Sequence, residues 1–107
     1  MGFNENLAQL AGVDHIERIR VSRERMLLSD IQNIDGKMGS LKVYANLLDF
    51  KDGQINRETA QRGLEIFDEV VEKARKKPGE HPNIDILIEV AESGSPVTAT
   101  IEYKLTT

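Results

Sequence analysis

The sequence contains no cysteine and no tryptophan, and only three phenylalanines and two tyrosines occur among its 107 residues. Without cysteine the chain can form no disulfide scaffold, no thiolate-bound zinc or iron–sulfur centre and no cysteine nucleophile. With so few aromatic side chains, the core must consist mainly of leucine, isoleucine and valine. No apolar run approaches the roughly 20 residues that cross a bilayer, so we expect neither a membrane-spanning helix nor a membrane partner.

Positive charge is also scarce, because 14 Lys and Arg residues face 18 Asp and Glu residues, a formal net charge of −4. A general nucleic-acid-binding protein needs a basic face that neutralises phosphates, so we expect no nucleic-acid partner. The basic cluster at residues 73–77 is better explained as the end of a helix, where cations interact favourably with the helix dipole. The first six residues have neither a basic stretch nor an apolar run, so we expect no secretion signal.

The N-terminal third of the chain predicts a short helix followed by a β-hairpin. Apolar residues at positions 3, 7 and 10 share one helical face, with Asn4 as a candidate cap and Gly12 as a stop. In residues 16–21 apolar side chains alternate with arginines, which is typical of a half-buried strand. We place the hairpin turn at residues 22–24 and the returning strand at residues 25–31.

The middle of the chain predicts two helices separated by a short break. Ser40 is a candidate N-cap for the first helix, which we expect to end near Asp52 and Gly53. Asn56 is placed to cap the second. Its apolar residues recur at helical spacing over about 20 residues, from Ala60 to Ala74, which predicts one helix about 30 Å long that forms the spine of the molecule.

The C-terminal region predicts a third helix at residues 84–93, ended by Gly94, and then a strand. The segment Val97–Tyr103 alternates apolar and polar residues and is rich in β-branched side chains. Because a lone hairpin is marginal in water, we expect this strand to join the hairpin. The predicted fold is α+β, a three-stranded and at least partly antiparallel sheet with helices on one face, in the order α-β-β-α-α-α-β. One domain covers residues 1–107.

Two of the three strands in such a sheet are edges. The unpaired backbone groups of an edge strand can pair with another chain. We therefore expect a non-catalytic binding or protein-interaction function in a homo-oligomer, most simply a dimer, that forms through its sheet or through a helix face.

Two polar segments are candidates for a site. In the loop at residues 36–40, Lys37 and Ser40 precede a helix and could bind an anion with backbone N–H groups, although the Walker A order of residues is absent. The structural alternative, which we favour, is that Ser40 caps its own helix.

The second segment is residues 80–85, where Glu80, His81 and Asp85 could hold a metal or orient a histidine base. Their spacing matches no established motif. The structural alternative is that His81 or Asn83 caps a helix whose first turn holds a proline and Asp85. We interpret Tyr44 as a core residue, and we assign no catalytic residue, metal or cofactor.

The strings Gly-Lys-Met-Gly-Ser-Leu at residues 36–41 and His-Pro-Asn-Ile-Asp at residues 81–85 resemble a family of small uncharacterised bacterial proteins. Residues 63–67 and the opening segment are similar as well. The resemblance implies a free-standing bacterial cytoplasmic protein and supplies no activity. The chain departs from the family pattern at Ile86, where a basic residue is usual, and in a hairpin turn without glycine.

Because both polar segments belong to this resemblance, we predict that they adjoin in space. A shared pocket of Lys37, Ser40, His81, Asn83 and Asp85 is therefore the alternative hypothesis. It would make the protein a small-ligand or anion-binding protein, or an enzyme.

Overall fold

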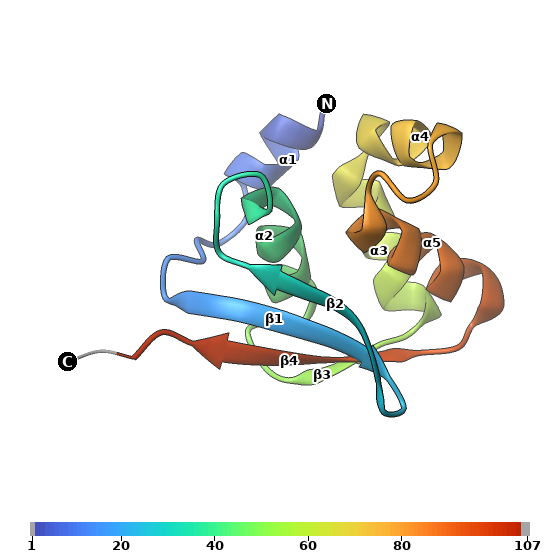
Figure 1. Cartoon of the computed structure of the whole chain (residues 1–107). Helices are drawn as coiled ribbons and strands as arrows, with labels where there is room; N and C mark the ends of the chain where they lie inside the picture. Colours follow the sequence, from blue (N-terminus) through green and yellow to red (C-terminus); the bar gives the residue numbers. More distant parts are fainter. Residues whose placement is uncertain (1, 106–107) are drawn as a thin grey trace.

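The computed structural model describes residues 2–105, which form a single layer of helices over a four-stranded sheet (Figure 1). The strands are β1 (Ile16–Arg23), β2 (Met26–Gln32), β3 (Gly53–Ile55) and β4 (Val97–Tyr103). The helices are α1 (Phe3–Ala8), α2 (Met38–Leu47), α3 (Arg57–Phe67), α4 (Glu69–Lys76) and α5 (Pro82–Ser93).

The sheet has the order β2-β1-β4-β3, and every neighbouring pair is antiparallel. The prediction that Val97–Tyr103 is a strand beside the hairpin is confirmed, with Ile19 opposite Ile101. The prediction of three strands is wrong, because Gly53 begins β3 instead of ending a helix. Helix α2 ends earlier than predicted, at Leu47. Strand β3 was missed because three residues are too few to show the alternation of apolar and polar side chains that identifies a strand in a sequence.

The hairpin turn begins two residues later than predicted. Strand β1 continues to Arg23, and Glu24 adopts the left-handed backbone conformation with a φ of 57°. The pairing register shifts within the hairpin, since Val21 faces Ser29 while Ser22 faces Leu27. Leu28 is the additional residue, so a β-bulge interrupts β2 near its start.

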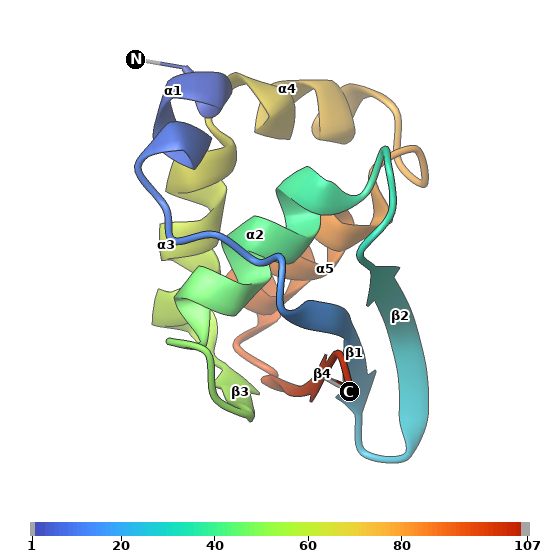
Figure 2. The same ribbon diagram turned by 90° about the vertical axis from the view of Figure 1, so that its left-hand side faces the viewer.

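The predicted spine is two helices and not one. At Asp68 the backbone has φ 51° and ψ −121°, which ends α3 and starts α4 in a new direction. Figure 2 shows α4 running across the end of α3. Apolar periodicity continues through the break, so the sequence pattern does not reveal it. The predicted cap of α3 is confirmed, because the Asn56 side chain accepts the Thr59 N–H at 2.9 Å.

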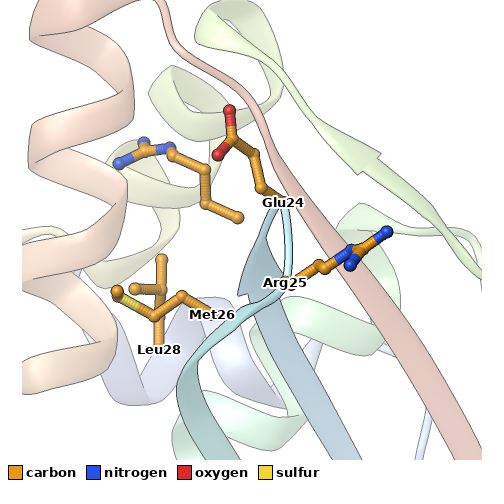
Figure 3. Close-up of a pocket in the computed structure, with 5 residues that line it drawn as sticks. Glu24, Arg25, Met26 and Leu28 are labelled. Atoms are coloured by element: carbon orange, nitrogen blue, oxygen red, sulfur yellow. The ribbon is translucent and has the colours of Figure 1, made fainter.

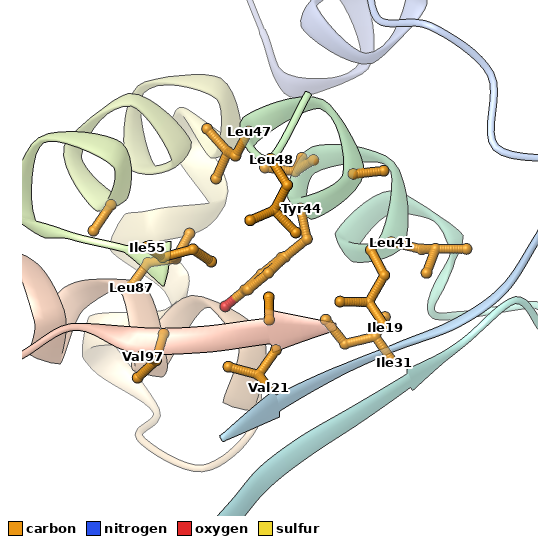
Figure 4. Packing of buried hydrophobic residues seen from close by; sticks show 14 of the residues in the cluster. Ile19, Val21, Ile31, Leu41, Tyr44, Leu47, Leu48, Ile55, Leu87 and Val97 are labelled. Carbon is orange, nitrogen blue, oxygen red and sulfur yellow. The ribbon is translucent and has the colours of Figure 1, made fainter. Parts of the chain in front are cut away.

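The core lies between the helices and one face of the sheet (Figure 4). The inner face carries buried aliphatic residues, with Tyr44 and Leu41 of α2 packed against them. The opposite face carries Arg18 and Arg20 of β1 and Thr98 and Thr100 of β4, and all of these except the half-buried Arg18 are exposed. The predicted helices on one face are therefore confirmed.

Helix α1 rests on the ends of α2 and α3 without burying any residue fully. Its cap position is Gly2, not Asn4 as predicted, because the helix already begins at Phe3. The Phe3 ring stacks on Phe67 with centroids 5.2 Å apart, and the Phe3 N–H donates to the Glu69 carboxylate at 2.8 Å. That hydrogen bond lowers the pKa of Glu69.

Candidate functional site

The two polar segments meet in the structure, as predicted from their resemblance to one family. The start of α2 and the start of α5 enclose a cavity of about 210 Å³. Its lining residues are Gly36, Lys37, Ser40, Glu80, His81, Pro82, Asn83 and Ile84. Four of the five proposed site residues thus line one cavity, and Asp85 does not.

Ser40 does not cap α2. The helix begins at Met38, with Lys37 in the cap position, so Ser40 lies inside the first turn. The Leu41 N–H already donates to the Lys37 carbonyl at 3.0 Å, which extends the helix by one turn beyond the prediction. The Ser40 side chain is therefore available to line the cavity.

His81 occupies the cap position of α5, but its imidazole makes no capping hydrogen bond there. The backbone carbonyl of His81 accepts the Asp85 N–H at 2.9 Å instead. Pro82 holds the first helical position, as predicted. The predicted cap position of His81 is therefore confirmed. The predicted capping hydrogen bond is not, because neither the His81 nor the Asn83 side chain makes one.

Asn83 connects three elements. Its backbone carbonyl accepts the Tyr44 hydroxyl at 2.6 Å, and its side-chain oxygen accepts the Ser29 hydroxyl at 2.5 Å. Tyr44 is fully buried, and burial raises the pKa of its hydroxyl far above the usual range. The hydroxyl therefore stays protonated and acts as a fixed donor, which confirms Tyr44 as a core residue. Asn83 therefore lines the cavity while its carbonyl and side-chain oxygens accept hydrogen bonds from other elements of the fold.

Asp85 lies outside the cavity because its carboxylate is used elsewhere. It accepts the Gly79 N–H at 2.9 Å and closes the turn between α4 and α5. Gly79 has a φ of 92°, which favours glycine. Spacing in the sequence does not reveal this contact, because the contact depends on how the turn folds back.

A second hollow of about 390 Å³ adjoins the cavity and shares Gly36, Ser40, His81 and Ile84 with it. The remaining walls are mostly apolar and come from Phe3, Leu7, Met38, Phe67 and Val70, with Asp35 and Gly39 completing the lining. Sequence reasoning missed this hollow, since its walls come from five separate helices. The polar cavity and this mostly apolar hollow therefore lie next to one another, with His81 in the lining of both.

The two hollows carry charges of both signs, because Lys37 and Glu80 line the cavity and Asp35 lines the second hollow. Residues 2–105 contain no group of three His, Cys, Asp or Glu side chains placed to hold a metal ion. No helix within this range is both long and apolar enough to cross a bilayer. The arrangement can bind a small polar molecule through side chains and free backbone N–H groups.

The other prominent surface is the edge of the sheet formed by β2. Met26 and Leu27 are 68% and 57% exposed there. A hollow of about 560 Å³ lies at the hairpin tip, lined by Arg23, Glu24, Arg25, Met26 and Leu28. In Figure 3 the Met26 and Leu28 side chains lie together, whereas Arg25 points away from them.

Arg23 fastens this hairpin to the body of the protein. Its guanidinium donates to the Ser95 carbonyl at 2.9 Å and forms an ion pair with Glu89 of α5. Hydrogen bonds from Ser93 and from Arg23 lower the pKa of Glu89. The hairpin base is therefore held, while its tip and its outer edge face solvent.

The model of one protein family, described as an "Uncharacterized protein conserved in bacteria (DUF2322)", matches residues 3–101. No curated protein and no solved structure matches the chain. The comparisons therefore identify a family but no activity.

Proposed function

From the premise that the chain belongs to this family of conserved bacterial proteins, we propose that it is a non-catalytic interaction protein that self-associates through its sheet. We place it in the cytoplasm, following the resemblance to free-standing bacterial proteins. Its net charge of −4 argues against a polyanionic partner.

The observation that carries the proposal is the exposed edge of β2. This strand has seven residues and pairs with β1 on one side; its other side has no strand neighbour within residues 2–105. It contains neither proline nor lysine, the residues with which proteins commonly block such edges. A second copy can extend the sheet by backbone hydrogen bonds and cover the apolar side chains at the same time.

Charge does not prevent this pairing. Asp30 is the single charged residue of β2, and Arg18 of β1 binds its carboxylate at 3.0 Å. The strand therefore presents little net charge to an approaching copy. An apolar and nearly neutral edge favours association over solvation.

The test is a charged substitution on this edge with a matched control. Leu27→Glu should raise the dimer dissociation constant at least about tenfold, because a carboxylate must then lose water in the interface. Leu105→Glu makes the same chemical change at a residue that is 96% exposed beyond β4, and it should leave association unchanged. Sedimentation velocity over a concentration series measures both variants. A wild-type protein that is monomeric at every concentration overturns the proposal.

A second candidate function rests on the cavity between α2 and α5. The convergence of Lys37, Ser40 and His81 on one cavity favours a small ligand that carries an anionic group. We propose this as the alternative role, either as a binding protein or as an enzyme acting on such a ligand.

A thermal-shift screen with phosphates, carboxylates, nucleotides and divalent metals tests this alternative. A ligand at 100 times its Kd adds about 2.7 kcal/mol of stability, which raises the melting temperature by several degrees. Lys37→Ala should reduce the shift, whereas Lys104→Ala removes a lysine that lies outside the cavity lining and should not. No shift with any compound rejects these ligand classes.

A further inference from the structure

We infer that the polar cavity and the mostly apolar hollow beside it form one binding site for a small amphipathic anion. The charged head of this ligand lies in the cavity, and its apolar tail lies in the hollow. The inference rests on the second candidate function proposed above, because it names the class of ligand that the cavity takes. It does not depend on self-association.

The polar cavity is too small to be a complete binding site. Its volume is about 210 Å³, whereas sites for small molecules usually measure about 300–1,000 Å³. The adjoining hollow contributes about 390 Å³, and Gly36, Ser40, His81 and Ile84 line both spaces. Figure 2 shows the loops before α2 and α5 near the end of the molecule that carries α1 and α4. A ligand that occupies both spaces therefore reaches the usual size and meets two kinds of wall.

The cavity carries the features that hold an anion. Helices α2 and α5 both begin at it, and within the described residues no side chain caps the first N–H groups of either helix. Such N–H groups carry partial positive charge and donate to anions. Among the charged side chains of the lining, Lys37 offsets Glu80, while Ser40 and His81 add polar groups. The charge balance of the cavity therefore favours a negatively charged head.

The hollow carries apolar side chains that are still partly exposed. Phe3 and Leu7 of α1 and Val70 of α4 are half-buried, and Met38 is 41% exposed. A tail that covers them removes apolar surface from water, which favours binding. The exposed Asp35 carboxylate also lines this hollow and repels an anionic head, so it directs the head towards the cavity.

Helix α1 forms one wall of the hollow and is already held in place. The Phe3 ring stacks on Phe67, with ring centroids 5.2 Å apart. The Phe3 N–H donates to the Glu69 carboxylate at 2.8 Å, and the Asn6 side-chain amide donates to the Ile66 carbonyl at 3.0 Å. A preformed wall loses little conformational entropy when a ligand binds, so the apolar contacts of the tail add to the affinity.

A chain-length series of n-alkyl phosphates, from methyl to hexyl phosphate, tests this site, with inorganic phosphate as the reference. NMR titration of the backbone amides measures the affinities and locates the ligand. Each added methylene should raise the affinity by about threefold, because it buries further apolar surface in the hollow. Amides of residues 36–40 should shift with every member, and amides of α1 only with the longer members. n-Alkylamines of the same lengths carry the opposite charge and should bind at least about tenfold more weakly.

Val70→Thr and Val71→Thr form a matched pair, because both residues are half-buried on α4 and, of the two, Val70 lines the hollow. Val70→Thr should weaken the binding of hexyl phosphate at least about threefold and leave that of methyl phosphate unchanged, since a hydroxyl replaces a methyl group beside the tail. Val71→Thr should change neither. Lys37→Ala should weaken the binding of every member by a similar factor, because all members share the same head.

Inorganic phosphate that binds at residues 36–40 without any gain from longer chains overturns this inference, while the proposed role of the cavity stands. Alkylamines that bind as tightly as the phosphates also overturn it, as does hexyl phosphate that binds Val70→Thr and Val71→Thr equally well. If no member of the phosphate series binds, both the inference and the anionic ligand of the cavity are rejected. Sedimentation velocity tests self-association separately from all of these results.

Discussion

The two edges of the sheet are built differently. Strand β3 has three residues, and its fully buried Ile55 belongs to the core. Just before β3 begins, the Asp52 carboxylate accepts the Ile101 N–H at 2.7 Å, so a side chain and not a strand backbone satisfies this donor of β4. Strand β2 is longer and carries exposed Met26 and Leu27 instead.

The difference between the two edges suggests that β3 contributes to the stability of the monomer and β2 to its proposed association. The β3 edge is short, its side chain is buried, and the Asp52 carboxylate satisfies a neighbouring donor. These are features that keep an edge from pairing. The β2 edge has a bulge and one paired carboxylate, and otherwise its backbone faces solvent. We therefore expect substitutions at β3 to change the stability of the monomer and substitutions at β2 to change its assembly.

The largest expected effect is at β3. Ile55→Ala removes a fully buried side chain and should lower the free energy of unfolding by about 3 kcal/mol. Leu27→Glu, at an exposed position, should change it by less than about 0.5 kcal/mol. Urea denaturation at a concentration where the protein is monomeric measures both. Equal losses would remove the distinction between the two edges.

A smaller effect is expected at Asp52. Asp52→Ala removes the acceptor of the Ile101 N–H and should lower the free energy of unfolding by about 1 kcal/mol. Hydrogen exchange at the Ile101 amide should become faster, which NMR detects directly. Asp52→Asn keeps an oxygen acceptor and should fall between the wild type and Asp52→Ala. An unchanged exchange rate in Asp52→Ala would show that β4 does not depend on this side chain.

The smallest effect concerns pH and the attachment of the hairpin. The pKa of Glu89 is lowered in the folded protein, mainly by the Ser93 hydroxyl and also by Arg23. A lowered carboxyl pKa stabilises the fold at pH values above the unfolded pKa, and this contribution is lost as the pH falls through the folded pKa. Amides of the hairpin should therefore exchange faster, relative to those of β3, as the pH falls below about 4.5.

The control for this prediction is Glu89→Gln, which cannot titrate. In this variant the ratio of hairpin to β3 exchange should no longer depend on pH in that range. A ratio that still changes would assign the pH dependence to another carboxyl group.

The strong patterns in the sequence predicted much of the fold. Alternation identified Val97–Tyr103 to the residue, and the Asn56 side chain and the positive φ of Gly94 mark helix ends where predicted. The break at Asp68 could not be predicted, because a single residue with positive φ leaves the apolar spacing intact. Strand β3 was not predicted because three residues are too few to show an alternation of apolar and polar side chains.

The candidate site was predicted only in part, and that part rested on a family resemblance and not on physical reasoning. Lys37, Ser40, His81 and Asn83 were grouped by resemblance to one family, and they line one cavity. Asp85 was grouped with them on the same resemblance, but its carboxylate folds back onto Gly79. The mostly apolar hollow beside the cavity depends on five helices packing together, which no local pattern records.

The hydrogen bonds of Asn83 have a mechanical consequence. Ser29 on β2 and Tyr44 on α2 both donate hydrogen bonds to this one residue at the start of α5, so the outer strand, the start of the helix and the core are connected through a single residue. Separating the outer strand from the helix layer therefore requires that the Ser29–Asn83 hydrogen bond be broken.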